Sequence, residues 1–199
     1  MGRRPANSEA TIEPHGVRLV DLVVHADDRG AFTETFRRSW LPDTAAPIVQ
    51  SNLSLSRAGV VRGMHFHRAQ ADYWVFLEGK VFVALFDVRA GSPTAGALET
   101  LAIDTAEARR GIFIPPGVAH GFCAITDVSL QYMVDAYYAG DDEHGFAWDD
   151  PEAAVPWPIG RPVLSARDAA APSLAEVRAD APPYDPVGDP RTAQARPQP

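Results

Sequence analysis

The chain has 199 residues, of which 46% are hydrophobic and 22% charged, and this composition predicts one globular domain with a hydrophobic core. A formal net charge of −8 argues against nonspecific binding to nucleic acid or to an anionic membrane, because both need a cationic face. A single cysteine, no signal-peptide pattern and no membrane-length apolar window predict a cytoplasmic protein without disulfides.

Residues 1–14 are polar and turn-rich, and residues 178–199 are rich in Pro, Asp and Arg, so both ends are predicted to be disordered. Residues 15–177 form one predicted domain made of short strands. In chain order the predicted strands are "VRLVDLVVH", "AFTETFR", "PIVQSNLSLS", "VVRGMHFH", "DYWVFLE", "KVFVALFDVR", "LETLAID", "GIFIPPG", "HGFCAI" and "SLQYMVDAYY".

Many short strands at regular spacing indicate a sandwich or barrel, and a jelly roll fits this pattern. The segment "RRSWLPD" is predicted to form one short helical turn. The run "KVFVALFDV" is apolar on both faces, so it is expected to lie centrally in a sheet or beneath a partner subunit.

Two segments carry histidines where a strand would normally be apolar. His65 and His67 share one face of their strand, which is costly inside a barrel unless they bind something or find partners. The alternative is a strand end where both are hydrated. In "FIPPGVAHGF" a Pro-Pro-Gly turn places His120 at the start of the next strand, aimed into a barrel mouth, or else in an ordinary hairpin.

Together these segments resemble the two cupin motifs. The first is met by Gly59, His65, His67 and Gly79, with Asp72 in place of a glutamate, and the second by Pro115, Gly117 and His120. In a metal cupin the corresponding side chains hold a divalent ion. A metal site at His65, His67, Asp72 and His120, suited to Zn, Fe, Mn or Ni, is therefore one hypothesis.

The chain further resembles a cupin branch that uses no metal, the dTDP-4-dehydrorhamnose 3,5-epimerase family. The matching pieces, spanning residues 17 to 174, are "DDRGAFTETF", "VQSN", "VVRGMHF", "GSPTAG", "IPPGVAHGF", "LQYMVDAYY", "GFAWDDP" and "LSARDAAAP". This resemblance implies an all-β, cupin-type double-stranded β-helix (jelly roll) with short helical segments. It also implies a homodimer, no cofactor, and a nucleoside-diphosphate 4-keto-6-deoxyhexose as substrate.

The resemblance assigns roles to individual residues. His65 is the expected base, Asp168 the carboxylate that orients it, and Tyr132 the acid. The expected contacts to the diphosphate and the sugar are Arg29, Glu34, Gln50, Asn52, Arg62, Asp72, His120, Glu143 and Arg167. A C4 ketone acidifies the C3 and C5 hydrogens, so epimerisation needs a base on one face of the ring and an acid on the other.

Two positions depart from the family pattern. Asp72 stands where the family has a lysine that stabilises the enolate oxygen, and His67 stands where glutamine is usual. A divalent ion would replace the lysine charge, although a metal on His65 would remove its lone pair from base duty. Alternatively, His67 or His120 supplies the positive charge while Arg68 or another arginine neutralises Asp72.

Three functions remain open at this point. The first is epimerisation of a keto-sugar nucleotide at C3, C5 or both. The second is a metal-dependent isomerase, cyclase or lyase acting on another carbonyl substrate. The third is a catalytically inactive sugar-nucleotide-binding protein.

The epimerase site also requires an irregular strand. Arg62 and His65 have opposite strand parity, so both reach one site only if a bulge forms near Gly59 or Gly63.

Overall fold

The computed structural model describes residues 9–138 and 140–184 of the chain, and it is built almost entirely of strands. The strands are β1 (Glu9–Thr11), β2 (Arg18–Leu22), β3 (Val24–Asp27), β4 (Gly30–Thr33), β5 (Gln50–Ser56), β6 (Val61–Phe66), β7 (Asp72–Glu78), β8 (Lys80–Asp87), β9 (Leu98–Asp104), β10 (Arg109–Ile114), β11 (Val118–Ala124), β12 (Val128–Val134) and β13 (His144–Gly145). The helical segments are the 3-10 turns η1 (Arg38–Trp40) and η2 (Gly140–Asp142), and the short helices α1 (Ala166–Ala169) and α2 (Leu174–Ala179).

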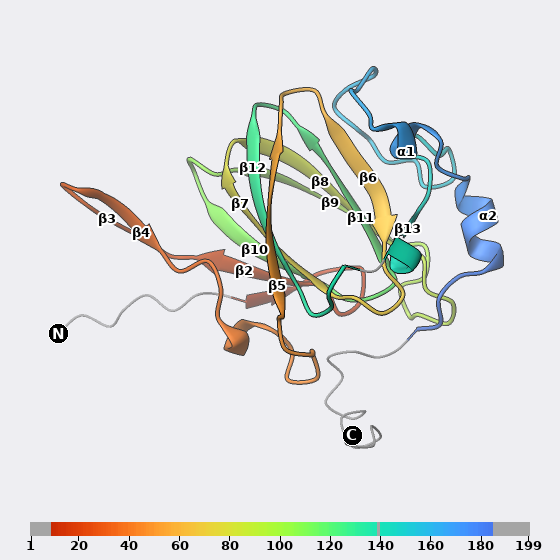
Figure 1. The fold of residues 1–199 in the computed structure, drawn as a ribbon, viewed down its shortest axis with the longest axis horizontal. Helices are drawn as coiled ribbons and strands as arrows, with labels where there is room; N and C mark the ends of the chain where they lie inside the picture. The colour runs from red at the N-terminus through yellow and green to blue at the C-terminus, as the bar shows by residue number, and fades with distance from the viewer. Residues whose placement is uncertain (1–8, 139, 185–199) are drawn as a thin grey trace.

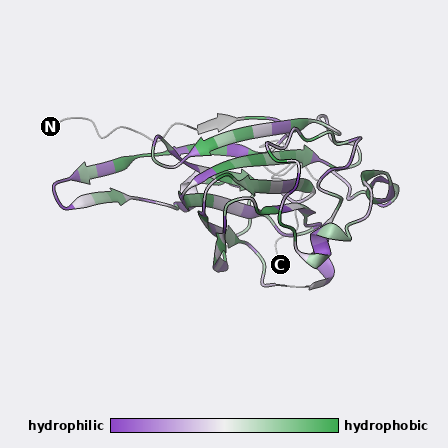
Figure 2. Ribbon diagram, turned by 90° about the horizontal axis from the view of Figure 1, so that it is seen from above, coloured by the Kyte–Doolittle hydropathy of each residue, from purple (hydrophilic) through white to green (hydrophobic). Residues whose placement is uncertain are grey.

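Two antiparallel sheets face each other and form the body of the molecule (Figure 1). One has the order β1-β2-β10-β7-β12-β5, and the other has the order β13-β6-β11-β8-β9. Strands β3 and β4 form a separate hairpin that extends away from this body, which is clearest when the molecule is seen from above (Figure 2). The predicted all-β jelly roll with short helical segments is confirmed.

The core between the sheets comes from the alternation of side chains along the strands. In β8, Val81, Val83 and Leu85 point inward and pack with residues of the opposite sheet such as Ile112 and Leu130. Burial of these fully enclosed aliphatic side chains stabilises the fold by about 1.5–3 kcal/mol each.

The other face of β8 is also buried, within the same chain. Ala84 and Phe86 pack against a second apolar cluster that includes Phe146 and Leu174 from the C-terminal segment. Strand β8 also lies between β11 and β9 in its sheet. The first of the two predicted placements of "KVFVALFDV" is thus confirmed, and its apolar outer face needs no partner subunit.

The described structure extends a little beyond the predicted domain limits of 15 and 177. Strand β1 pairs with β2 through Glu9–Thr11, and helix α2 continues to Ala179. The remaining predicted tails, residues 1–8 and 185–199, lie outside the described residues. The longest α-helix in the described part, α2, has six residues, so no helix there has the length of a membrane span.

Candidate active site

A cavity of about 250 Å³ opens between the two sheets, and we call it the central cavity. Its lining is Ser54, Arg62, His65, His67, Asp72, Trp74, His120, Phe122, Leu130, Tyr132, Glu143 and Arg167. Eight of these residues were predicted from the sequence as catalytic, substrate-binding or metal-binding candidates. The fold therefore collects most of the chemically distinctive side chains into one place.

The walls of the central cavity come from different sheets. Strands β6 and β11 supply His65 and His120 on one side, whereas β7 and β12 supply Asp72 and Tyr132 on the other. The side chains reach the same space because each strand turns alternate residues toward the facing sheet. A molecule held between the walls is exposed to different chemical groups on its two faces.

A register shift allows Arg62 and His65 to share this cavity. Strand β11 pairs with β6 through His120↔His65 and Phe122↔Arg62, so the pairing slips by one residue between them. Gly63 lies at this point with φ +131°, a conformation that favours glycine. The predicted bulge near Gly59 or Gly63 is confirmed at Gly63.

His65 is hydrogen-bonded to Asp168 across two elements. Nε2–H of His65 donates to Oδ1 of Asp168 at 2.5 Å, and Asp168 lies in α1, whose N-terminus is capped by the Ser165 side chain. Burial disfavours the charged form of Asp168, but its hydrogen bond with His65 and nearby positive charge outweigh this effect. The pKa of Asp168 consequently lies below its usual range, and the group is ionised at neutral pH.

Tyr132 lies on β12, in the wall opposite His65. Burial, together with the negative charges of Asp72 and Glu143, raises the pKa of the Tyr132 phenol above its usual value. The hydroxyl is therefore protonated at neutral pH and can act only as a proton donor or a neutral hydrogen-bonding group.

His67, Asp72 and His120 form a compact group deeper in the central cavity. Their ligand atoms all lie within 4.8 Å of one another, and the two imidazole centroids are 5.8 Å apart. Burial lowers the pKa of His120 to about 4, so its ring is neutral at pH 7. His65, the fourth member of the predicted metal set, lies outside this group, and its Nε2 is bound to Asp168.

The expectation that Arg68 neutralises Asp72 is wrong. The Arg68 guanidinium instead binds the Asp180 carboxylate at 2.6 Å, on the outer side of β6. Asp72 accepts hydrogen bonds from Gln70 Nε2 at 2.8 Å and from Trp74 Nε1 at 3.0 Å, and both of these donors are neutral.

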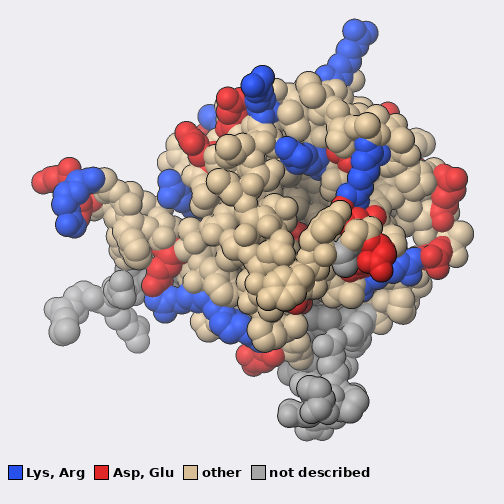
Figure 3. Space-filling view, viewed as in Figure 1, with Lys and Arg blue, Asp and Glu red and all other residues tan. Residues whose placement is uncertain are grey.

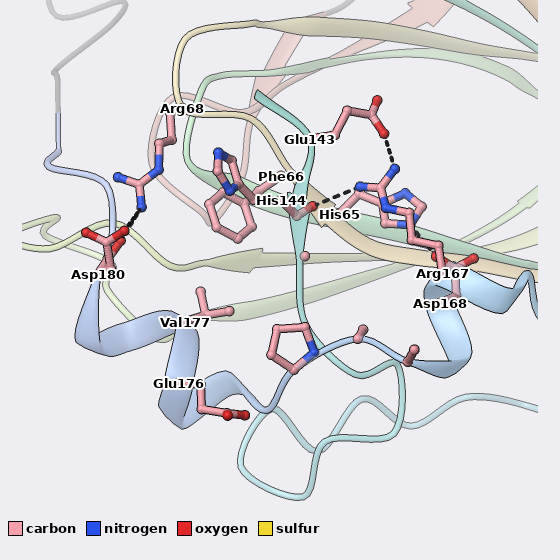
Figure 4. A pocket seen from close by; sticks show the side chains of 14 residues that line it. His65, Phe66, Arg68, Glu143, His144, Arg167, Asp168, Glu176, Val177 and Asp180 are labelled. Atoms are coloured by element: carbon pink, nitrogen blue, oxygen red, sulfur yellow. Dashed lines mark hydrogen bonds and ion pairs between the residues drawn. The ribbon is translucent and has the colours of Figure 1, made fainter. Parts of the chain in front are cut away.

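A second cavity of about 490 Å³, the outer cavity, lies on the other side of His65 (Figure 4). Arg167 and Glu143 form an ion pair at the boundary and line both cavities, as His65 does. Asp168 lines the outer cavity only. The guanidinium of Arg62 completes the positive charge at the central cavity, where it is held by the Ser56 hydroxyl at 2.9 Å.

Four predicted substrate contacts do not line either cavity of their own chain. Gln50 and Asn52 lie on β5, hydrogen-bonded to each other at 2.9 Å and on the same strand face as the lining residue Ser54. Arg29 lies at the turn of the β3–β4 hairpin, paired with Asp27, while Glu34 follows β4 and pairs with Arg37.

Four lining residues were not predicted from the sequence: Ser54, Trp74, Phe122 and Leu130. Each lies two residues from a predicted site residue on the same strand, namely Asn52, Asp72, His120 and Tyr132. Strand parity was the signal that would have found them, because side chains two positions apart share a face.

Comparison with known proteins shows the family of this chain. The family model described as dTDP-4-dehydrorhamnose 3,5-epimerase matches residues 11–176. The dTDP-4-dehydrorhamnose 3,5-epimerase of Mycobacterium tuberculosis is 40% identical over 179 residues, covering 82% of this chain and 86% of the relative. The dTDP-4-dehydrorhamnose 3-epimerase of Streptomyces niveus is 41% identical over 170 residues, covering 82% of each chain.

The fold comparison gives the same result. A solved 4-keto-6-deoxy sugar epimerase from the novobiocin biosynthetic gene cluster of Streptomyces spheroides superimposes with a TM-score of 0.84 at 35% identity. The match covers 94% of this chain and 98% of that one.

The jelly roll and these relatives together identify a cupin-type sugar isomerase. The chain belongs to the dTDP-4-dehydrorhamnose 3,5-epimerase family, and it is an isomerase of the epimerase class. Neither of the other functions considered finds support in these comparisons: not a metal-dependent isomerase, cyclase or lyase on another carbonyl substrate, and not an inactive sugar-nucleotide-binding protein.

Proposed function

We propose that this protein epimerises a dTDP-linked 4-keto-6-deoxyhexose at C3, C5 or both, by removing a proton next to the C4 ketone. The observation that carries this proposal is the placement of His65 and Tyr132 on opposite walls of one cavity, with Asp168 bound to His65. A sugar ring between the walls would present one face to the base and the other to the acid.

The base in this scheme is Nδ1 of His65. Because the ionised Asp168 accepts the Nε2–H, the proton of the neutral ring is on Nε2 and the lone pair is on Nδ1. When Nδ1 takes the C3 or C5 proton, the carboxylate stabilises the imidazolium that forms. The electrons of the broken C–H bond form a double bond to C4, and the C4 ketone oxygen takes the negative charge of the enolate.

The acid is Tyr132. Its raised pKa keeps the phenol protonated at neutral pH, so it can deliver a proton to the carbon from the face opposite His65. Inversion requires this second face, because return of the proton from His65 would restore the starting configuration.

The diphosphate is assigned to the arginines at the cavity. Arg62 and Arg167 both line it, and guanidinium groups bind phosphate oxygens through paired hydrogen bonds. In the structure Arg167 is paired with Glu143, so substrate phosphate would compete with that carboxylate. Proton transfer of this kind needs no redox cofactor.

The test is solvent exchange followed by NMR. Incubation with dTDP-4-keto-6-deoxyglucose in D₂O is expected to place deuterium at C3, at C5 or at both, which identifies the carbon. In the His65→Ala variant the rate of deuterium incorporation is expected to fall by about 10²–10⁴-fold, because the base is absent. Absence of incorporation by the folded wild-type protein, with or without added divalent ions, would refute the proposal for this substrate.

We further propose that the protein acts as a homodimer in which the β3–β4 hairpin completes the site of the partner. Arg29 and Glu34 line neither the central nor the outer cavity of their own chain. Phe32 on the hairpin is 60% exposed, and Leu55 on the edge strand β5 is 65% exposed. Apolar side chains exposed on both elements favour their burial between two copies.

Mixing two inactive variants tests this arrangement. Arg29→Ala removes the hairpin charge, and His65→Ala removes the base, so a mixed dimer would contain one intact site if the hairpin crosses to the partner. We expect activity to reappear on mixing and subunit exchange, together with a dimeric mass by sedimentation equilibrium. A monomeric mass, or a mixture as inactive as the separate variants, would contradict the proposal.

A further inference from the structure

The geometry points to a divalent metal site in the central cavity: we propose that His67, Asp72 and His120 bind one first-row divalent ion. The site is separate from the His65–Asp168 pair. Only the catalytic role given to the ion rests on the proposed function, since the binding itself does not.

Both imidazoles are held so that one particular nitrogen faces the group. His67 places Nδ1 at 2.8 Å from the Asp142 carbonyl oxygen, and His120 places Nδ1 at 2.9 Å from the Val118 carbonyl oxygen. A carbonyl only accepts, so Nδ1 carries a proton in each ring, and Nε2 is the nitrogen that can bind a metal. Histidines that bind metals are oriented in this way by backbone carbonyls.

The two Nε2 atoms each lie near a different oxygen of the Asp72 carboxylate. Nε2 of His67 lies 4.0 Å from Oδ1, and Nε2 of His120 lies 3.8 Å from Oδ2. These separations are too long for hydrogen bonds. Tetrahedral zinc with bonds of about 2.0–2.2 Å holds neighbouring ligand atoms about 3.3–3.6 Å apart, so the binding of an ion would draw each imidazole toward the carboxylate by a few tenths of an ångström.

The Asp72 side chain has no Lys or Arg among its ion-pair neighbours in the described chain. It is 4% exposed, and its ion-pair neighbours within the described chain are only the two histidines, at 4.0 and 3.8 Å. Gln70 and Trp74 fix its orientation through neutral hydrogen bonds. A buried carboxylate is costly unless it is paired or coordinates a cation, and a divalent ion would supply the missing positive charge.

Two imidazoles and one carboxylate form the ligand set of open zinc and ferrous sites, in which further positions remain for water or substrate. Here those positions would face the cavity that also contains His65 and Tyr132. Given the proposed function, an ion there would polarise the C4 carbonyl and stabilise the enolate oxygen. His65 keeps its Nδ1 lone pair for the proton, so the ion and the base do not compete.

Metal titration of the full-length chain tests the site independently of activity. Protein stripped with a chelator is titrated with Co²⁺, which reports ligation through its visible absorption, and bound metal is counted by elemental analysis. We expect one ion per chain in the wild type. His67→Ala and the isosteric Asp72→Asn are expected to weaken binding by more than about tenfold, because each loses a ligand.

His25→Ala is the matched control, because it removes an exposed imidazole on the hairpin strand β3, outside the group. Its affinity for Co²⁺ is expected to equal that of the wild type, while circular dichroism verifies that every variant is folded. Equal, weak binding by all four proteins would mean an adventitious ion only and would overturn the site.

Deuterium exchange of the metal-free and reloaded enzyme tests the catalytic role. Removal of the ion is expected to slow exchange by about 10²-fold or more, with recovery on adding metal to the wild type but not to Asp72→Asn. Equal rates with and without metal would overturn the catalytic role and leave the proposed function standing. Stoichiometric binding with no exchange in either state would instead uphold the site and refute the proposed function.

Discussion

At the scale of single residues, the proposed mechanism depends on which ring nitrogen of His65 is free to take a proton. A metal ligand and a general base both need an imidazole lone pair, so the sequence alone left two roles competing for this side chain. Its hydrogen bond to Asp168 occupies Nε2, and the neighbouring group of His67, Asp72 and His120 is complete without it. In the scheme proposed above, base and metal chemistry therefore belong to different histidines.

Asp168→Asn is expected to lower kcat by about 10²–10⁴-fold, because the amide neither fixes the Nε2–H tautomer nor stabilises the imidazolium. KM should change little, since Asp168 does not line the central cavity. Steady-state kinetics with the keto-sugar nucleotide check this split. An unchanged kcat, or an effect confined to KM, would contradict the orienting role.

Tyr132→Phe is expected to separate exchange from inversion. The base remains, so the substrate should still acquire deuterium from D₂O, but a proton can then return only from the His65 face. Inversion at the exchanging carbon should fall by about 10²–10⁴-fold. NMR of the same sample measures both quantities, and parallel loss of exchange and inversion would assign Tyr132 another role.

At the scale of elements, the close contact between β6 and β11 places His65, the proposed base. Gly63 has φ +131°, and a Cβ built there would lie 2.6 Å from the Gly121 Cα and 3.0 Å from the His120 carbonyl oxygen. The contacting atoms belong to the backbone of β11, so they cannot move aside as the end of a flexible side chain would. The register shift that brings Arg62 and His65 together depends on this glycine.

Gly63→Ala is therefore expected to destabilise the protein by more than about 1 kcal/mol, since both the conformation and the space are incompatible with a side chain. Activity should fall as well, because His65 and His120 both adjoin the strained contact. Gly160→Ala is the control: a Cβ there meets nothing within 4 Å, so its effect should stay within about 0.5 kcal/mol. Urea denaturation of both variants measures the difference, and equal midpoints would refute the argument.

At the scale of the whole molecule, a buried ion pair ties the end of β8 to the loops around it. Arg89 donates to the Asp87 carboxylate at 2.7 Å and to the His15 carbonyl oxygen at 2.7 Å, and Ser92 and Thr94 donate to the same carboxylate. On the face of the molecule seen in Figure 3, by contrast, acidic and basic groups are intermixed. Exposed pairs of that kind contribute only about 0–1 kcal/mol each.

The Asp87 pair predicts how stability depends on pH. Burial disfavours the charged carboxylate, but the hydrogen bonds and charge of Arg89, with Ser92 and Thr94, lower the pKa of Asp87 below its usual 3.8. Near pH 3.8 the unfolded chain then binds more protons at this group than the folded chain does, so its stabilising contribution is present above that pH and lost below it.

Asp87→Asn is expected to destabilise the protein by about 3–5 kcal/mol at pH 7, because it leaves the buried Arg89 without its countercharge. Its free energy of unfolding should also fall less steeply than that of the wild type between pH 5 and 2. Urea denaturation across this range checks both effects, with Asp104→Asn on the surface pair with Lys80 as the control. Parallel pH profiles for wild type and Asp87→Asn would refute the assignment.

Most strands of this protein were predictable because each is specified by neighbouring residues, but β1 and β13 were not predicted, and "VRLVDLVVH" divides between β2 and β3. The segment "DYWVFLE" became β7 and "LETLAID" became β9 without a change of boundary, since alternation and turn residues act over a few positions. The residue motifs likewise indicated the histidines of the cavity. Local pattern and family resemblance together were enough for the fold class and for most of the cavity lining.

Only the tertiary structure decided how the side chains of the site are partnered. The hydrogen bond between His65 and Asp168 joins residues 103 positions apart, and that between His67 and the Asp142 carbonyl joins residues 75 apart. The separation of the hairpin residue Arg29 from the cavity of its own chain is equally invisible in a local pattern. Such contacts depend on how the two sheets pack against each other, and the alternation of side chains along one strand carries no information about that packing.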